Sequence, residues 1–207
     1  ILMSNGRTDE AEKRLAAARE AEPDYAIQLY LIQAETLSAN NQGDRAWKLL
    51  QQALLQFPDD LNLLYTRAML AERMGKIDVL EKDLRAILAK EPDNSQALNA
   101  LGYTLADSTK RYDEALALIT RALELSPKDF YILDSMGWVL YRLGRLDEAI
   151  QYLEKARELR NDPEVAAHLG EVLWVKGDRA AATKTWETAL RDTPNDKKLL
   201  EVIKRLK

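Results

Sequence analysis

The side chains that could carry out chemistry are few in this chain, and their types argue against a catalytic centre. His168 is the only histidine and there is no cysteine, so a zinc site with the usual ligand set is excluded. A Ser-His-Asp triad would require a nucleophile beside His168, but no nucleophile motif surrounds the candidate, Ser135. The acids Asp93 and Asp162 lie beside predicted turns and are typical of helix caps. The sequence therefore predicts no enzyme activity, no metal and no cofactor.

Recognition of a protein or peptide partner is the chemistry that the remaining side chains favour. Aromatic residues recur among Asn, Asp and Arg residues, which is the residue mix of binding hot spots. The candidate binding residues are Tyr65, Met69, Asn99, Tyr103, Tyr131, Asp134, Trp138, Tyr141, Arg142, Glu171 and Trp174. The alternative is that some of the aromatic side chains pack on neighbouring helices, and Trp138 and Trp174 are the most ambiguous in this respect.

The elements that position these residues follow from a repeat. All six prolines recur at nearly one interval, with spacings of 35, 34, 35, 36 and 31 residues. They are Pro23, Pro58, Pro92, Pro127, Pro163 and Pro194. A period near 34 is typical of an array of helix–turn–helix repeats, which present extended surfaces to partners.

A small residue recurs with the same period and marks the middle of the first helix of each repeat. The positions are Ala34, Ala68, Gly102, Gly137 and Gly170. Because Gly inside a helix costs about 1 kcal/mol relative to Ala, its use here indicates that a second helix approaches closely. Gly75, Gly144 and Gly177 follow seven residues later, where a left-handed residue is expected to end the first helix.

The second helix of each repeat carries its own apolar stripe. A small residue stands at Ala46, Ala115, Ala149 and Ala182, with Leu80 as the exception. A large apolar residue follows four positions later, at Leu50, Leu84, Ile119, Leu153 and Trp186. These offsets place the stripe on one helix face, so we expect Leu153 and Trp186 to lie in the core.

The pattern resembles the tetratricopeptide repeat family, whose consensus is W-x2-L-G-x2-Y followed by G, A, F, A and P. The last repeat matches it best, with Leu169-Gly170, Leu173, Gly177, Ala182, Trp186, Ala189 and Pro194. The resemblance implies an all-α fold, a right-handed superhelical solenoid of antiparallel helix pairs. It divides the chain into a partial repeat at 1–26, repeats at 27–60, 61–94, 95–129, 130–162 and 163–196, and a capping helix at 197–207. Arg67 and Leu80 depart from the pattern, which wants an apolar and a small residue there.

In this family the first helices line the concave face, so the resemblance places the candidate residues in a groove. The exposed slots are expected three residues before, one after and four after the small residue of each first helix. Chaperone-binding members hold a C-terminal carboxylate with Lys and Asn at these slots, but no Lys occupies the equivalent positions here. A carboxylate clamp of that kind is therefore not expected.

Composition and the two ends of the chain limit the remaining possibilities. The net charge of −4 and the sequence pI of about 5.3 argue against a general affinity for nucleic acid. No window approaches the ~18 apolar residues of a membrane span. Residues 1–26 lack most of a first helix, so we expect a piece of a longer array, with self-association at this end or fraying of residues 1–8. Residues 197–207 are expected to cap the array, and an amphipathic helix on a membrane surface is the alternative.

Two stretches are more particular than the general repeat. Residues 132–144 and 167–174 resemble the C-terminal repeats of proteobacterial outer-membrane TPR lipoproteins, and within that group the lipoprotein adaptors of the periplasmic protease CtpA. This resemblance implies an upstream lipid anchor, a location at the periplasmic face of the outer membrane, and delivery of cell-wall hydrolases to the protease. The alternative is an assembly scaffold, such as a pilotin-like or cell-wall-synthesis lipoprotein, that acts through its convex face or the end of the array.

Overall fold

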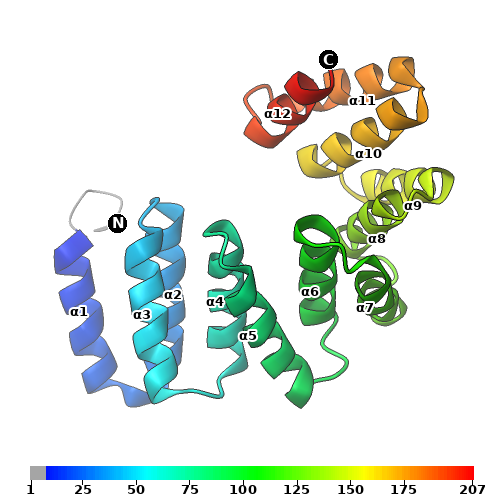
Figure 1. The fold of residues 1–207 in the computed structure, drawn as a ribbon. Helices are drawn as coiled ribbons and strands as arrows, with labels where there is room; N and C mark the ends of the chain where they lie inside the picture. Colours follow the sequence, from blue (N-terminus) through cyan, green and yellow to red (C-terminus); the bar gives the residue numbers. More distant parts are fainter. Residues whose placement is uncertain (1–7) are drawn as a thin grey trace. The chain divides into compact units, whose positions relative to one another are not determined.

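The computed structural model describes residues 8–207, which form α-helices joined by short turns (Figure 1). Twelve α-helices and a 3-10 turn at Pro23–Tyr25 make up this part of the chain, and it contains no strand. The helices are α1 (Thr8–Ala21), α2 (Ala26–Ala39), α3 (Gly43–Gln56), α4 (Leu61–Arg73), α5 (Ile77–Lys90), α6 (Ser95–Ser108), α7 (Tyr112–Leu125), α8 (Phe130–Arg142), α9 (Leu146–Leu159), α10 (Pro163–Lys176), α11 (Arg179–Asp192) and α12 (Lys197–Leu206). The predicted all-α class is confirmed, whereas the predicted fraying of residues 1–8 falls almost wholly outside the described residues.

The helices form two compact units, which are described separately. The N-terminal unit holds α1–α5, and the C-terminal unit, from Asp93 onward, holds α6–α12. Within each unit a first helix pairs with the next helix of the chain: α2 with α3 and α4 with α5, then α6 with α7, α8 with α9 and α10 with α11. In the C-terminal unit α8 packs against both α6 and α10, and α12 packs against α10. First helices therefore stack side by side, which brings residues one repeat apart into contact.

The close approach within a helix pair is as the small residues predict. A Cβ atom added at Gly102 would lie 2.6 Å from Ile119 Cγ1, and one added at Gly137 would lie 2.5 Å from Leu153 Cγ. At Gly170 it would overlap the indole of Trp186, which is 1% exposed. The predicted core positions of Leu153 and Trp186 are confirmed.

Most of the predicted helix ends are also present. Gly177 ends α10 in the left-handed conformation with φ 102°, where an L side chain would be strained. Asp162 caps α10 by accepting a hydrogen bond from Glu164 N. The predicted cap at Asp93 is wrong, because Asn94 accepts from the start of α6 and Asp93 pairs instead with Arg121 at 2.7 Å.

The exception to the repeat pattern in the N-terminal unit is compensated by a buried ion pair. Arg67 on α4 donates from Nε and Nη2 to the two carboxylate oxygens of Asp83 on α5, at 2.7 and 2.8 Å. Asp83 is 1% exposed, and the paired hydrogen bonds satisfy both of its oxygens. Leu80, in place of a small residue, is fully buried. A charged residue at an apolar slot therefore holds the same helix pair together by different chemistry.

Candidate functional site

Trp138 on α8 is the centre of a group of polar and aromatic side chains in the C-terminal unit. Its ring stacks on His168 of α10, with centroids 4.2 Å apart and planes inclined by 25°. The centre of the Tyr141 ring lies 5.1 Å from that of the Trp138 ring. The indole Nε1 of Trp138 donates a hydrogen bond to Asp107 Oδ1 of α6 at 3.2 Å. Three first helices thus meet at this indole. We call the group formed by Tyr103, Asp134, Trp138, Tyr141, His168 and Glu171 the polar–aromatic cluster.

A histidine–carboxylate pair joins α8 to α10 inside the cluster. His168 Nδ1 lies 2.9 and 3.0 Å from the two oxygens of Asp134, and both residues are 7% exposed. Since a carboxylate only accepts, Nδ1 carries the proton. Burial lowers the pKa of His168, but the charge and hydrogen bond of Asp134, aided by Glu164 and Glu171, outweigh it and raise the pKa above its ordinary value.

A second buried carboxylate ties three helices together. Glu171 of α10 is 3% exposed and accepts from Tyr141 OH of α8 at 3.1 Å and from Arg205 Nη2 of α12 at 2.5 Å. Burial and the neighbouring charge of Glu171 raise the pKa of Tyr141 to about 12. The neutral phenol therefore remains a donor throughout the physiological range.

Arg142 closes the edge of the cluster. Its guanidinium donates to the backbone oxygen of Asp107 at 3.1 Å and to Tyr112 OH at 2.9 Å, and lies 5.2 Å from the centre of the Tyr112 ring. These contacts bridge α8 to the end of α6 and the start of α7. Arg142 is half-buried, so part of this side chain remains open to solvent.

The structure separates the candidate binding residues into buried and accessible ones. The expectation of open groove slots is wrong for Asp134, Trp138 and Glu171, which neighbouring first helices and α12 cover. For Trp138 the packing alternative is the correct one. The half-buried candidates of the C-terminal unit are Asn99, Tyr103, Tyr141, Arg142 and Trp174. We call the accessible surface formed by Tyr103, Tyr141 and Arg142 the first-helix face; the buried members of the polar–aromatic cluster lie beneath it.

Four other candidates lie apart from this cluster or in the other unit. Tyr131 is 56% exposed, and its ring packs on Phe130 with centroids 3.9 Å apart. Trp174 packs on Trp186 of α11, at 5.6 Å. Tyr65 and Met69 lie half-buried on α4 of the N-terminal unit. Trp138 therefore has Tyr141 and His168 as ring neighbours, whereas the Tyr131 ring packs on Phe130.

His168 is the member of the cluster that the sequence analysis did not assign to the binding site, since it was considered there only as a metal ligand or a member of a catalytic triad. A signal was available, because Asp134 precedes it by 34 residues, which is one repeat period. Residues one period apart on first helices become neighbours when the helices stack. Among the described residues, no group of three or more His, Cys, Asp or Glu side chains could hold a metal ion.

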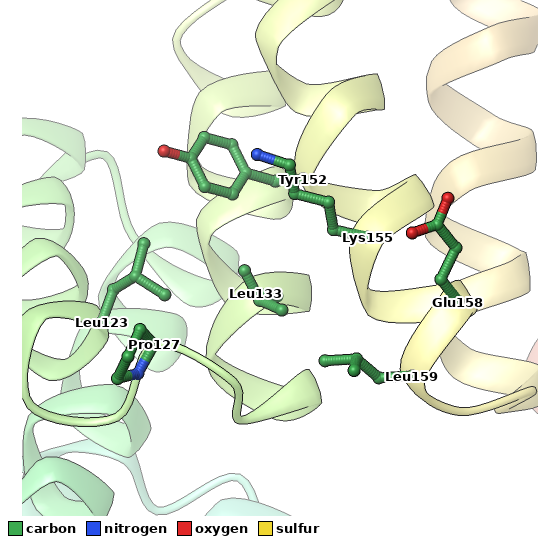
Figure 2. Close-up of a pocket in the computed structure, with 7 residues that line it drawn as sticks. All are labelled: Leu123, Pro127, Leu133, Tyr152, Lys155, Glu158 and Leu159. Carbon is green, nitrogen blue, oxygen red and sulfur yellow. The ribbon is translucent and has the colours of Figure 1, made fainter.

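A separate hollow lies among α7, α8 and α9 (Figure 2). This α7–α9 pocket has a volume of about 370 Å³ and is lined by Leu123, Pro127, Leu133, Tyr152, Lys155, Glu158 and Leu159. Its floor adjoins a small core of Leu133, Ala156 and Val165. Lys155 Nζ lies 5.1 Å from the centre of the Tyr152 ring, at the rim.

Comparisons with known proteins agree with this architecture. Models of the tetratricopeptide repeat match residues 93–162 and, separately, residues 2–72 and 140–206. The chain is 58% identical over 171 residues to the TPR repeat-containing protein PA4667 of Pseudomonas aeruginosa, an alignment that covers 83% of this chain. The aligned part of this chain spans only 29% of the length of that relative.

Two solved structures share the fold. A thermophilic TPR protein of Thermus thermophilus, TTC0263, superposes with a TM-score of 0.75 at 24% identity, over 86% of this chain and 96% of that one. A tetratricopeptide repeat protein from Parabacteroides merdae gives a TM-score of 0.82 at 18% identity, over 99% of this chain and 81% of that one.

The stacked helix pairs and their contact surfaces define a repeat scaffold of the kind that binds other proteins. The chain belongs to the tetratricopeptide repeat family. Members of this family are generally non-catalytic scaffolds. No helix in the described part of the chain is long and apolar enough to cross a membrane.

Proposed function

We propose that this protein is a non-catalytic adaptor that binds a protein partner through the first-helix face of its C-terminal unit. The observation that carries the proposal is the way in which Tyr103, Tyr141 and Arg142 are supported. Each is partly accessible, and Tyr141 and Arg142 are fixed by hydrogen bonds to groups on neighbouring helices. A side chain that is already ordered loses less conformational entropy on binding, so a preorganised aromatic surface favours affinity.

The finer proposal concerns the partners and the place. We propose that the adaptor brings together a periplasmic protease of the CtpA type and its cell-wall hydrolase substrates, at the periplasmic face of the outer membrane. Support comes from the resemblance of residues 132–144 and 167–174 to outer-membrane TPR lipoproteins. The extensive identity to a longer bacterial TPR protein is compatible with this proposal. A lipid anchor would belong to a part of the protein outside this chain.

The test uses the purified protease and a purified cell-wall hydrolase as probes, each titrated calorimetrically into the chain. We expect Tyr103→Ala and Tyr141→Ala each to weaken binding by about 2 kcal/mol if they are hot spots, which is roughly thirtyfold. Trp138→Ala is unsuitable because the residue is buried, so that its loss would disturb the fold.

Tyr25→Ala is the control, since it removes an exposed tyrosine of the N-terminal unit that belongs to neither candidate surface. Circular dichroism must show an unchanged helix content for every variant. Binding that is unaffected by both first-helix variants would refute the proposed surface. The finer proposal requires that both the protease and the hydrolase bind the chain, so failure of one of them to bind would refute it.

A second candidate function, an assembly scaffold that binds through the surface around α7 and α9, is favoured by the α7–α9 pocket. Lys155 and Glu158 at its rim have no ion pair within residues 10–207, although other charges of α9 and α7, such as Glu148 and Arg121, are paired. Leu159 beside them is exposed. The variants Leu159→Glu and Tyr152→Ala decide between the two surfaces, because loss of binding with these and not with Tyr103→Ala would favour the scaffold.

A further inference from the structure

The inference concerns the pair that joins α8 to α10 beneath the first-helix face. His168 Nδ1 points at both oxygens of Asp134, so the two helices share one proton-bearing contact that excludes water. A neutral imidazole can donate this hydrogen bond to the Asp134 carboxylate, but an imidazolium adds the attraction between two opposite charges where water is excluded. The strength of the connection between the two helices therefore depends on the protonation of His168.

The same ring supports Trp138. The imidazole covers one face of the indole at 4.2 Å, in a nearly parallel arrangement. A cation over an aromatic face is attracted by the ring quadrupole, and more strongly where water is excluded. Trp138 in turn contacts Tyr141, one of the accessible residues of the first-helix face. Protonation of His168 thus acts on the accessible surface through a single intervening side chain.

The charged groups around His168 favour the imidazolium. Asp134 faces it from α8, and Glu164 and Glu171 act on it from α10 itself. From α12, Lys198 and Arg205 hold these two glutamates at 2.8 and 2.5 Å, so their charges are partly neutralised. From α6 the ring of Tyr103 lies 6.2 Å from the His168 ring, centroid to centroid. The α9 and α11 helices also pack against α10, but within the described residues none of their charged groups forms an ion pair or hydrogen bond with His168.

We propose that His168 is a positioning residue: its imidazolium, paired with Asp134, keeps Trp138 in place and thereby orders the first-helix face. Deprotonation of His168 then makes this face more mobile. The raised pKa of His168 sets the sign. Its contribution to stability is fully present below the unfolded-state value of about 6.5, and is lost as the pH rises through the folded-state pKa. The face is accordingly expected to be tighter in mildly acidic solution. The effect of the His168–Asp134 pair on partner binding rests on the proposed function, whereas its effect on the order of Trp138 does not.

The experiment exploits the fact that the chain has a single histidine. An NMR titration of the His168 ring gives its midpoint, and hydrogen exchange of the Trp138 indole N–H, which is bonded to Asp107, reports how firmly the indole is held. The indole N–H of Trp47, on α3 of the N-terminal unit, is the internal reference, so that the intrinsic pH dependence of exchange cancels in the ratio.

We expect a His168 midpoint above 6.5, and a Trp138/Trp47 exchange ratio that rises by at least about threefold over the same titration. Asp134→Asn should lower the midpoint and move the rise with it. His168→Phe keeps an aromatic ring against Trp138 but removes the titrating imidazole, and should abolish the pH-dependent rise of the exchange ratio. A midpoint at or below 6.5, or a ratio that does not follow the His168 titration, would overturn the proposal.

Binding is measured separately, with the purified protease and hydrolase at pH values on both sides of the midpoint. If the exchange ratio rises with the His168 titration while Tyr103→Ala and Tyr141→Ala leave binding unchanged, the proposed role of the His168–Asp134 pair is supported and the proposed binding surface is refuted. If those variants weaken binding while the exchange ratio does not follow the His168 titration, the proposed binding surface is supported and the proposed role of the His168–Asp134 pair is refuted.

Discussion

Gly170→Ala tests the packing of the repeat most severely. The added Cβ would overlap Nε1, Cε2 and Cδ1 of Trp186, an indole that is almost fully buried and cannot move into solvent. Overpacking of this kind costs about 1–3 kcal/mol, and the rigidity of the indole favours the upper end. The better helix propensity of alanine offsets about 1 kcal/mol. We therefore expect a net loss of about 2 kcal/mol from the unfolding free energy.

The assay is thermal unfolding followed by circular dichroism. A loss of about 2 kcal/mol corresponds to a fall in Tm of roughly 4–8 °C for a chain of this size. Gly43→Ala is the matched control, because its Cβ would meet only Leu70 Cδ1, at 3.9 Å, and we expect no loss of stability there. A Gly170→Ala protein that melts at or above the wild-type temperature would refute the reasoning about close approach.

Three further outcomes are expected. Trp186→Ala should lower the unfolding free energy by about 3–5 kcal/mol in a denaturant titration, and a loss below about 1 kcal/mol would contradict its place in the core. Asp83→Asn should destabilise the N-terminal unit by more than the double change Arg67→Met/Asp83→Leu, because only the single change leaves a partly buried guanidinium without its carboxylate. Equal melting temperatures for the two proteins would argue against this. Glu171→Gln should lower the pKa of Tyr141 from about 12 toward 10, as measured by ultraviolet difference titration against a Tyr141→Phe protein. Because the folded-state pKa is raised, the stabilising contribution of Tyr141 is present below pH 10 and is lost toward pH 12, and an unchanged titration would contradict the role of Glu171.

The repeat phase and the core were predictable from the sequence for a simple physical reason. Gly137 and Gly170 are tolerated in helix interiors only because a second helix fills the space of their side chains, so their period reports the helix pairing directly. Trp186 could be placed in the core by the same periodicity. Period and residue size are properties that a single sequence carries.

The site was less predictable because it depends on which way side chains turn between repeats. Trp138 lies at a slot expected to be exposed, yet it is buried by His168 of the next repeat. One period separates Asp134 from His168, but the pairing depends on side-chain orientations that the period does not specify. Asp93 was expected to cap α6, but its neighbour Asn94 takes that role, which is the usual one-residue uncertainty at a helix end.

The α7–α9 pocket could not be foreseen at all from the repeat pattern. It depends on Leu133, Tyr152 and Leu159 leaving space between two helices and the turn that precedes α8. A repeat pattern indicates which positions are apolar, but not where their packing is incomplete. For that reason no residue of this pocket was assigned a role in advance.

The central claim is that a protein partner contacts the first-helix face of residues 93–207. Site-specific photo-crosslinking tests it most directly, with benzoylphenylalanine placed at Tyr103 or, in a separate protein, at Leu159 of the α7–α9 pocket. Each protein is irradiated with the purified protease and with the purified hydrolase, and the adducts are identified by mass spectrometry. We predict adducts from position 103 that excess unlabelled wild-type chain suppresses. Adducts from position 159 with none from position 103 would contradict the claim.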